Sequence, residues 1–289
     1  MTTTDAFQAV VLQATQEDLF EHVLNDALIG SSIYVNIALA GVSLVAFALL
    51  AWDVEDPRAN LIVVSAMAVC AVSITSYTGL ASGLTLSVIE MPEGHALAGE
   101  SVNLANGPTV DGTISLWGRY LTWAFSTPFI LLALGLIAGS SFTKIFTAIV
   151  FDVGIMIGGL AAALTTSNLL LRWWFYILAT VFFLVVVYIL LVEWPKDAEV
   201  AGTTEIFNTL RLLTVVLWFG YTIWWAVGNE GLALIESSGV TSWGYSAFDV
   251  IAKYGFGFLV VRYAVNNVDK ISEGSDYGST TSTPTAADD

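Results

Sequence analysis

Two side chains of opposite charge stand four positions apart near the C-terminal end of the chain, inside an otherwise apolar stretch. They are Asp249 and Lys253, within residues 242–266. An i, i+4 spacing places both on one face of a helix. A lysine kept away from water is a suitable amine for an imine with an aldehyde. The alternative interpretation is a structural ion pair that only fixes how helices pack.

A second polar stripe occurs in the third apolar stretch of the chain. Arg119, Thr122 and Ser126 follow i, i+3, i+7 spacing and share one helix face. Taken alone, the two hydroxyls could simply bond carbonyls of their own helix. If Lys253 carries a protonated imine, however, Arg119 and Asp249 cancel and one positive charge remains at low dielectric. Because this stretch contains no carboxylate, a halide held by the hydroxyls would restore neutrality.

Aromatic side chains form a third stripe. Trp218, Tyr221 and Trp225 recur at i, i+3, i+7, and Trp123 supplies a ring from the helix with the hydroxyls. Such stripes are often ordinary packing. Around a buried lysine they favour a pocket for a long conjugated ligand.

The elements that must hold these residues follow from composition. The chain has 289 residues, 56% of them hydrophobic and only 12% charged, whereas soluble domains carry about a quarter charged residues. Apolar segments of about twenty residues recur along the chain. Each is long enough to cross a bilayer core of about 30 Å. We therefore predict an all-α integral membrane protein, a seven-transmembrane-helix bundle in the cell membrane. Its spans are 29–52, 60–87, 114–138, 142–165, 168–193, 203–228 and 242–266.

The remaining segments divide the chain into three parts. Residues 1–28 form an N-terminal segment with a short amphipathic helix at 17–25. Residues 29–266 form the membrane domain, including a long acidic loop at 88–113. Residues 267–289 are rich in Ser, Thr, Gly and Asp, a composition typical of a disordered tail.

Basic residues predict the orientation. Lys and Arg concentrate on the cytoplasmic side of membrane proteins. If the N-terminus is outside, every basic residue near a loop falls on the inner side, except Arg172. Those residues are Arg58, Lys144, Lys196, Arg211, Arg262 and Lys270. The N-terminus is therefore expected to be extracellular and the C-terminus cytoplasmic.

The net charge of −16 argues against nucleic-acid binding, which needs basic patches. It fits solubility in high salt, where screening suppresses repulsion within an acidic surface, and indicates a halophile. The single cysteine, Cys70, excludes a disulfide framework. We expect no metal site.

Three sequence segments resemble the microbial rhodopsins, and among them the halorhodopsins, the light-driven chloride pumps of archaea. The first is Trp-Gly-Arg-Tyr-Leu-Thr-Trp-Ala-Phe-Ser-Thr-Pro at 117–128. The second is Thr-Ser-Trp-Gly-Tyr-Ser-Ala-Phe-Asp-Val-Ile-Ala-Lys at 241–253, and the third is Glu-Met-Pro-Glu-Gly-His at 90–95. Proton-pumping relatives carry carboxylates where this chain has Thr122 and Ala133. The Thr122, Ser126, Ala133 pattern resembles the chloride pumps.

The resemblance implies a role for each matching residue. All-trans retinal would be bound covalently at Lys253 as a protonated Schiff base with Asp249 as counterion, and chloride would bind at Thr122, Ser126 and Arg119. Arg211 and Thr214 would form a cytoplasmic anion exit, and Glu230 an extracellular polar position. The retinal pocket would comprise Trp123, Ile155, Gly159, Phe183, Trp218, Tyr221, Thr222 and Trp225.

Some positions depart from the family pattern. Thr222 stands where the sixth helix normally has a proline, so this helix can keep a hydrogen bond that proline would remove. Gly255 and Gly257 resemble proton pumps, and Ala179 replaces a frequent hydroxyl. These changes bear on colour and on the speed of the photocycle.

The sequence thus predicts a transporter rather than an enzyme, moving chloride or another halide inward when light isomerises retinal. The alternatives are a retinal photosensor, a light-driven proton pump, and a retinal-free transporter or receptor with a structural Asp249–Lys253 pair. The lipid bilayer is the expected environment and a homotrimer is implied by the resemblance. Carotenoid binding is not predicted either way.

Overall fold

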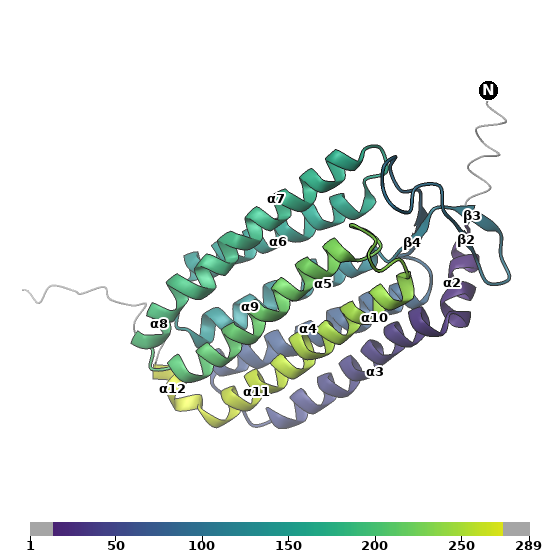
Figure 1. Cartoon of the computed structure of the whole chain (residues 1–289). Coiled ribbons are helices and arrows are strands. Elements are labelled where there is room, and N and C mark those ends of the chain that lie inside the picture. Colours follow the sequence, from purple (N-terminus) through teal and green to yellow (C-terminus); the bar gives the residue numbers. More distant parts are fainter. Residues whose placement is uncertain (1–13, 274–289) are drawn as a thin grey trace, which may run out of the picture.

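Seven long helices lie side by side in a computed structural model that describes residues 14–273 (Figure 1). Five of them are single α-helices: α3 (Ala27–Leu50), α4 (Pro57–Ala81), α5 (Gly118–Ile137), α6 (Phe142–Leu164) and α9 (Thr204–Val227). The fifth helix along the chain begins as α7 (Leu169–Tyr188). The seventh runs through α10 (Ser238–Asp249), the π-helical segment η2 (Val250–Gly255) and α11 (Phe256–Asn266). The predicted seven-helix fold is confirmed.

Side-chain caps fix where several of these helices begin. Asp26 accepts hydrogen bonds from the backbone N–H groups of Leu28 and Ile29 at the start of α3. Asp56 does the same at α4, whose first residue is Pro57. Such caps satisfy N–H groups that have no partner within the helix, and proline at the first position has no N–H to satisfy.

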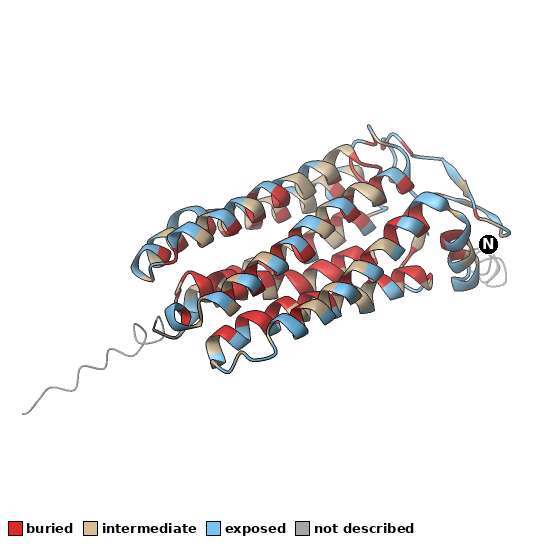
Figure 2. Ribbon diagram, turned by 90° about the horizontal axis from the view of Figure 1, so that it is seen from below, coloured by how far each residue is buried: buried red, intermediate tan, exposed pale blue. Residues whose placement is uncertain are grey.

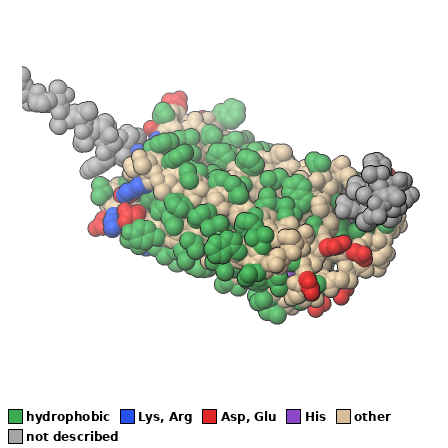
Figure 3. All heavy atoms as spheres, turned by 90° about the horizontal axis from the view of Figure 1, so that it is seen from above, with side chains coloured by type: hydrophobic (Ala, Val, Ile, Leu, Met, Phe, Trp, Pro, Cys, Tyr) green, Lys and Arg blue, Asp and Glu red, His purple; other side chains and the backbone are tan. Residues whose placement is uncertain are grey.

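The outward faces of the helices are apolar. Large hydrophobic side chains such as Val42 and Leu49 are each 67% exposed, and Figure 3 shows hydrophobic side chains covering the middle of the surface with charges toward its ends. Figure 2 shows buried residues following the inward faces. A surface of this kind belongs in lipid, where each helix satisfies its own backbone. The chain is a multi-span membrane protein.

One end of the bundle, here termed the capped end, carries α2 (Gln16–Asn25) and four short strands (Figure 1). Strand β1 (Ser87–Ile89) pairs with β4 (Thr113–Ser115), and β2 (Ser101–Asn103) pairs with β3 (Thr109–Asp111), both antiparallel. The second and third spans were therefore predicted too long at this end, since residues 87 and 114 belong to strands. Three-residue strands are too short to show an alternating pattern.

The chain turns sharply between α4 and β1, directly under α2. Gly83 has φ +73, and a Cβ there would lie 2.7 Å from the carbonyl oxygen of Gln16. The side chain of Gln16 donates to the carbonyl of Ser82 at 3.1 Å. Glycine is needed at this turn both for its backbone conformation and for the close approach of α2.

The fifth helix extends past its predicted end at residue 193. After α7 it continues through the π-helical segment η1 (Ile189–Glu193) into α8 (Trp194–Val200). Pro195 has no N–H, so the carbonyl of Leu191 loses its ordinary i+4 donor. A guanidinium nitrogen of Arg211, on α9, donates to that carbonyl at 3.4 Å.

The opposite end, here termed the tail end, carries α8 and α12 (Val268–Glu273) (Figure 1). The Nζ of Lys144 lies 2.7 Å from a carboxylate oxygen of Asp197, which ties α6 to α8. The segment expected to be disordered from residue 267 thus begins with a helix. Its remainder, and residues 1–13, lie outside the described residues.

Candidate functional site

Lys253 and Asp249 form a buried ion pair near the middle of the bundle. Nζ of Lys253 lies 3.0 Å from Oδ2 of Asp249, and the two side chains are 2% and 0% exposed. Lys253 belongs to η2, which begins at Val250, directly after α10 ends at Asp249. π-helical turns of this kind often occur at functional sites.

Three further donors hold the Asp249 carboxylate. Tyr77 on α4 donates to Oδ2, the same oxygen that contacts Lys253. Tyr221 on α9 donates to Oδ1, and the indole N–H of Trp123 on α5 donates to Oδ1 at 3.2 Å. The carboxylate is therefore fixed from three helices besides its own.

Arg119 reaches the same cluster through Tyr77. One terminal nitrogen donates to the Tyr77 hydroxyl at 3.0 Å, and the other donates to the carbonyl of Ser242 at 3.1 Å and to the hydroxyl of Ser246 at 3.3 Å. The sequence pattern missed Tyr77, which looked like an ordinary aromatic residue of the second span. Arg119 and Asp249 are linked by this hydroxyl, not by an ion pair within 4.0 Å.

The two hydroxyls of the third-helix stripe differ in their surroundings. Both are fully buried. Thr122 donates to the carbonyl of Gly118 at 3.1 Å and contacts the Ser76 hydroxyl at 2.7 Å. The Ser126 hydroxyl has no hydrogen-bond partner, and neither has Nε of Arg119. Buried polar atoms without partners are uncommon in proteins, so these two are candidate ligands for an ion.

The local charge balance supports an anion. Lys253 and Arg119 are cationic, and Asp249 is the carboxylate that contacts this cluster. One positive charge remains in excess in a buried site, which is costly without a compensating negative charge. The residues present therefore fit a bound halide.

Asp152 is a further buried carboxylate, which was not predicted from the sequence. Asp152 on α6 is fully buried, and its Oδ2 accepts a hydrogen bond from the hydroxyl of Thr127 on α5 at 2.6 Å, while Oδ1 has no partner. The signal was available, because an ionisable residue deep inside an apolar span is rarely accidental.

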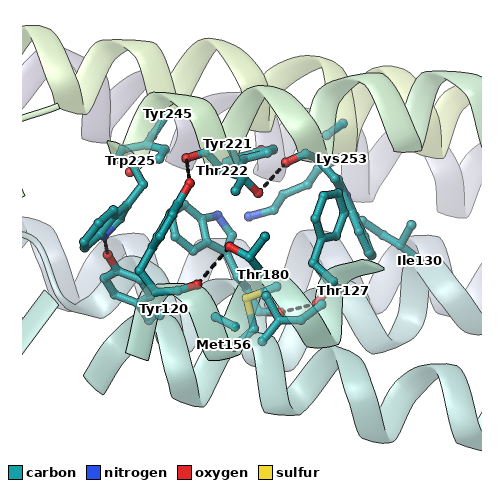
Figure 4. Close-up of a pocket in the computed structure, with 18 residues that line it drawn as sticks. Tyr120, Thr127, Ile130, Met156, Thr180, Tyr221, Thr222, Trp225, Tyr245 and Lys253 are labelled. Carbon is teal, nitrogen blue, oxygen red and sulfur yellow. Dashed lines mark hydrogen bonds between the residues drawn. The ribbon is translucent and has the colours of Figure 1, made fainter. Parts of the chain in front are cut away.

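An apolar cavity of about 100 Å³ extends from Lys253 between the helices. Figure 4 shows the lysine side chain reaching into the space between the aromatic side chains. Every residue expected to line a retinal pocket lines this cavity. Other lining residues that the sequence analysis did not name as pocket residues are Tyr120, Thr127, Ile130, Met156, Tyr176, Ala179, Thr180, Tyr245 and Ala252.

Aromatic contacts make the cavity walls rigid. The ring of Trp123 lies 5.4 Å from that of Tyr221 and 5.1 Å from that of Tyr245, and Tyr176 stacks on Trp225 at 4.8 Å. Such contacts favour one arrangement of the rings. A cavity lined by aromatic rings and by a buried amine suits a conjugated aldehyde.

Thr222 lines the cavity without breaking α9. Its hydroxyl donates to the carbonyl of Trp218 at 3.1 Å, and its own carbonyl accepts from the hydroxyl of Tyr176 at 3.2 Å. The sixth helix is therefore an uninterrupted helix from Thr204 to Val227, as expected where threonine replaces proline.

Arg211 and Thr214 lie on α9, away from the cavity lining. The hydroxyl of the buried Thr214 donates to the carbonyl of Leu210 at 2.9 Å. The half-buried Arg211 donates to Leu191, as described above. Neither residue has a hydrogen bond or ion pair with the Lys253 cluster.

Glu230 lies at the capped end of the bundle, 7% exposed. Its carboxylate accepts hydrogen bonds from the Ser115 hydroxyl at 2.9 Å and the Tyr120 hydroxyl at 2.7 Å. Its backbone carbonyl accepts one from Nε of Arg172 at 2.7 Å. Arg172, the exception to the orientation pattern, is fully buried. Burial lowers the pKa of His95 in the neighbouring loop, and the charge of Arg172 lowers it further.

Comparisons with known proteins place this architecture in a family. The sequence pattern of bacteriorhodopsin-like proteins matches residues 27–267. The chain belongs to the bacteriorhodopsin-like protein family. It is 58% identical to the halorhodopsin of Natronomonas pharaonis, covering 97% of this chain and 96% of that protein. It is 54% identical to the halorhodopsin of Haloarcula marismortui over the full length of both.

Solved structures agree with the sequence relatives. One described as "Halorhodopsin, a light-driven chloride pump" is 51% identical with a TM-score of 0.80, covering 86% of this chain and 99% of the other. A bromide-bound halorhodopsin from Halobacterium salinarum is 52% identical with a TM-score of 0.79, covering 85% and 97% of the two chains. Within its family the chain is thus a member of the halorhodopsins.

Proposed function

We propose that this protein is a light-driven inward chloride pump. The observation that carries the proposal is the unpartnered Ser126 hydroxyl, buried on a helix that has no carboxylate. It lies on the same helix face as Arg119, which belongs to a cluster with one excess positive charge. A carboxylate on this helix, in addition to Asp249, would let the site exchange a proton. Donors without an acceptor favour a transported anion instead.

Retinal fits the cavity on three grounds. The cavity is lined by aromatic and aliphatic side chains, it ends at a desolvated amine, and the amine has a fixed carboxylate partner. Bound covalently to Lys253 as a Schiff base, all-trans retinal supplies light absorption and a change of shape on isomerisation to 13-cis. The tyrosines and the indole that hold Asp249 keep its negative charge in place throughout.

The other residues are assigned along a path for the ion. Arg119, Thr122 and Ser126 hold chloride close to the Lys253–Asp249 pair. Ser126 offers a free donor, and Thr122 provides another by turning its hydroxyl away from Ser76 and the Gly118 carbonyl. Arg211 and Thr214 stand toward the tail end as the exit, and Glu230 stands at the capped end as the entrance.

The orientation belongs to the same proposal. We place the capped end outside and the tail end in the cytoplasm, because Lys144, Lys196 and Lys270 gather at the tail end. The acidic composition and the halophilic sources of the relatives support a halophilic archaeon as the host. A homotrimer remains the expectation from the resemblance.

The decisive experiment is the light-driven pH change of a cell suspension, measured in chloride and in sulfate with and without a protonophore. Inward chloride transport draws protons in passively, so the external pH rises, the rise grows with protonophore, and it vanishes in sulfate. Outward acidification that persists in sulfate and is abolished by protonophore would mean a proton pump. A coloured protein with no transport would favour a photosensor, and a colourless one after retinal addition would favour a retinal-free protein.

A further inference from the structure

The wall of the cavity on the far side from Lys253 carries three hydroxyl groups. Tyr176 and Thr180 belong to α7, Thr222 belongs to α9, and all three line the cavity. Figure 1 shows α7 at one side of the bundle and α10, which leads into the lysine-bearing segment η2, at the other. A ligand that is attached to Lys253 and fills the cavity therefore reaches these hydroxyls.

Each of the three hydroxyls already uses its hydrogen within the protein. Thr180 donates to the carbonyl of Tyr176 at 2.8 Å, and Thr222 donates to the carbonyl of Trp218 at 3.1 Å. Tyr176 donates to the carbonyl of Thr222 at 3.2 Å, a bond that joins α7 to α9. A hydroxyl has one hydrogen to donate and two lone pairs that accept. With their hydrogens engaged, these three oxygens offer only acceptors to the cavity.

A wall of this kind distinguishes between polar groups on a ligand. Ala179 and Phe183, on the same helix as Thr180, also line the cavity and are apolar. A ligand hydroxyl buried beside them without a partner would be costly, but here it can donate to a threonine oxygen. A ketone has only lone pairs, so it meets other lone pairs unless a threonine first gives up its bond to the helix. An unsubstituted hydrocarbon ring neither gains nor loses a hydrogen bond.

We propose that the cavity takes a retinal with a hydroxyl on its ring, and that the oxygens of Thr180 and Thr222 recognise this hydroxyl. The inference rests on the proposed retinal binding and adds the class of retinal that the pocket prefers. Thr222 stands where the family normally has proline, a residue without a hydroxyl. One of the two acceptors is therefore a departure of this chain from the family pattern, and the departure bears on the choice of ligand as well as on the backbone of α9.

The test incubates the full-length protein, freed of chromophore, with an equimolar mixture of all-trans retinal and its 3-hydroxy, 4-hydroxy and 4-oxo derivatives. When the bound composition is constant, the washed protein is denatured and the released chromophores are quantified by chromatography. The reference is the double variant Thr180→Val with Thr222→Val, which keeps the shape of the wall. At least one hydroxy derivative should be enriched over unsubstituted retinal about fivefold more in the wild type than in the reference, the value of one hydrogen bond. The same composition in both proteins, or equal enrichment of the 4-oxo derivative, would overturn the proposal.

Two matched variants complete the design. Thr180→Ser with Thr222→Ser keeps both oxygens and should retain the enrichment. Thr75→Val removes a hydroxyl that makes the same kind of bond, to the carbonyl of Ala71 at 3.1 Å, but Thr75 is exposed on α4 and does not line the cavity. Its enrichment should equal that of the wild type. Loss of enrichment in the serine variant, or in Thr75→Val, would show that the two threonine oxygens do not select the ligand.

Infrared difference spectra of the wild type provide a readout that does not depend on how the variants fold. The O–H stretching band of the enriched hydroxy derivative should lie at lower frequency than in an apolar solvent, because the bound hydroxyl donates a hydrogen bond. A band at the frequency found in the apolar solvent would also reject the proposal. A protein that stays colourless with every aldehyde, unsubstituted retinal included, would contradict the proposed function itself. A protein that takes unsubstituted retinal and prefers no hydroxy derivative contradicts only this inference.

Discussion

The hydroxyl of Tyr77 donates a hydrogen bond to Oδ2 of Asp249, the oxygen that lies 3.0 Å from Nζ of Lys253. Tyr77 also accepts from Arg119. The neutral Tyr77 side chain thus lies between Arg119 and Asp249. The carboxylate therefore interacts directly with Lys253 and through the Tyr77 hydroxyl with Arg119. Removal of this hydroxyl affects the ion pair without changing the net charge of the site.

Tyr77→Phe should shift the absorption maximum to shorter wavelength, because Asp249 then concentrates its charge on the Lys253 side. Its unfolding free energy should fall by about 1–3 kcal/mol, since a terminal nitrogen of Arg119 loses its acceptor. Spectra and thermal bleaching measure the two effects. Tyr254→Phe is the control: that hydroxyl donates to the carbonyl of Asn36 at 3.0 Å, so stability should fall with little change in colour. Equal spectral shifts would contradict this role for Tyr77.

Ser126→Ala should weaken halide binding more than Thr122→Val does. Ser126 has a free donor, whereas Thr122 must first give up its contact with Ser76. We expect about a tenfold rise in the halide dissociation constant for Ser126→Ala, the value of a hydrogen bond to an ion. Spectral titration with chloride measures it. The reverse order of the two variants would mean that Thr122 is the principal hydroxyl ligand.

Thr222→Pro should destabilise the dark protein by about 3 kcal/mol or more. Proline removes the backbone N–H and crowds the carbonyl four residues earlier, at Trp218. Thr222→Val keeps the helix bond and removes only the hydroxyl, which donates to Trp218. Thermal bleaching should therefore separate the two variants. A colour change shared by both would come from the hydroxyl, and one confined to the proline variant would come from the helix. Equal stability in both would show that the backbone bond at this position contributes nothing.

Contact between α2 and the strand-bearing loop should weaken in acid through His22. Nδ1 of His22 accepts from the backbone N–H of Ala105 at 3.4 Å, an acceptor lost on protonation. Burial lowers the pKa of His22, with Asp26 opposing the shift. Because the folded pKa is below that of the unfolded chain, stability is constant above the ordinary histidine value of about 6.5. It falls as the pH drops through that value toward the lower folded one.

Hydrogen exchange of α2 and of β2–β3 between pH 8 and pH 5 tests this dependence. His22→Asn keeps an acceptor without a titrating group, so the protection factors, which correct for the intrinsic pH dependence of exchange, should become insensitive to pH in this window. Asp18 does not interfere, because hydrogen bonds from Thr15 lower its pKa and it stays ionised. The same acid sensitivity in the variant would assign the effect to another group.

Thr127→Val should cost about 1–3 kcal/mol, because it leaves the buried Asp152 carboxyl without its hydroxyl partner. Replacing both residues with apolar ones, Thr127→Val with Asp152→Leu, should recover much of that loss, since no buried polar group is then left unpaired. Thermal bleaching of the single and double variants provides the comparison. A double variant as unstable as the sum of its single variants would show that the pair acts independently.

Much of the fold and part of the site were predictable from the sequence. Apolar runs gave all seven helices, and regular spacing placed Arg119, Thr122 and Ser126 on one face. Contacts between helices were not predictable, because a stripe does not fix how far each helix is rotated toward its neighbour. Tyr77 and Ser76 therefore gained roles only in the folded bundle.

Irregular backbone was the other feature that could not be predicted from the sequence. The strands of the loop are too short for periodicity, and the π-helical segment that contains Lys253 leaves no compositional mark. Spacing counted as regular α-helix still paired Lys253 with Asp249, although residues 250–253 lie in the π-helical segment. The prediction of this pair succeeded because only residues 250–252 separate Asp249 from Lys253.

The proline in the fifth helix has a consequence for how this protein changes over time. Pro195 releases the Leu191 carbonyl, and that carbonyl receives Arg211 from the neighbouring helix. Pro195 is not proposed to contact the ion. It nevertheless influences the position of Arg211, which is proposed to lie on the ion path. Replacing Pro195 would restore a backbone N–H that competes with Arg211 for the Leu191 carbonyl. Substitutions at positions 195 and 211 should therefore be tolerated better together than singly. Sequence change at Pro195 is in this way coupled to the proposed transport route, and this position inherits the constraint of the route.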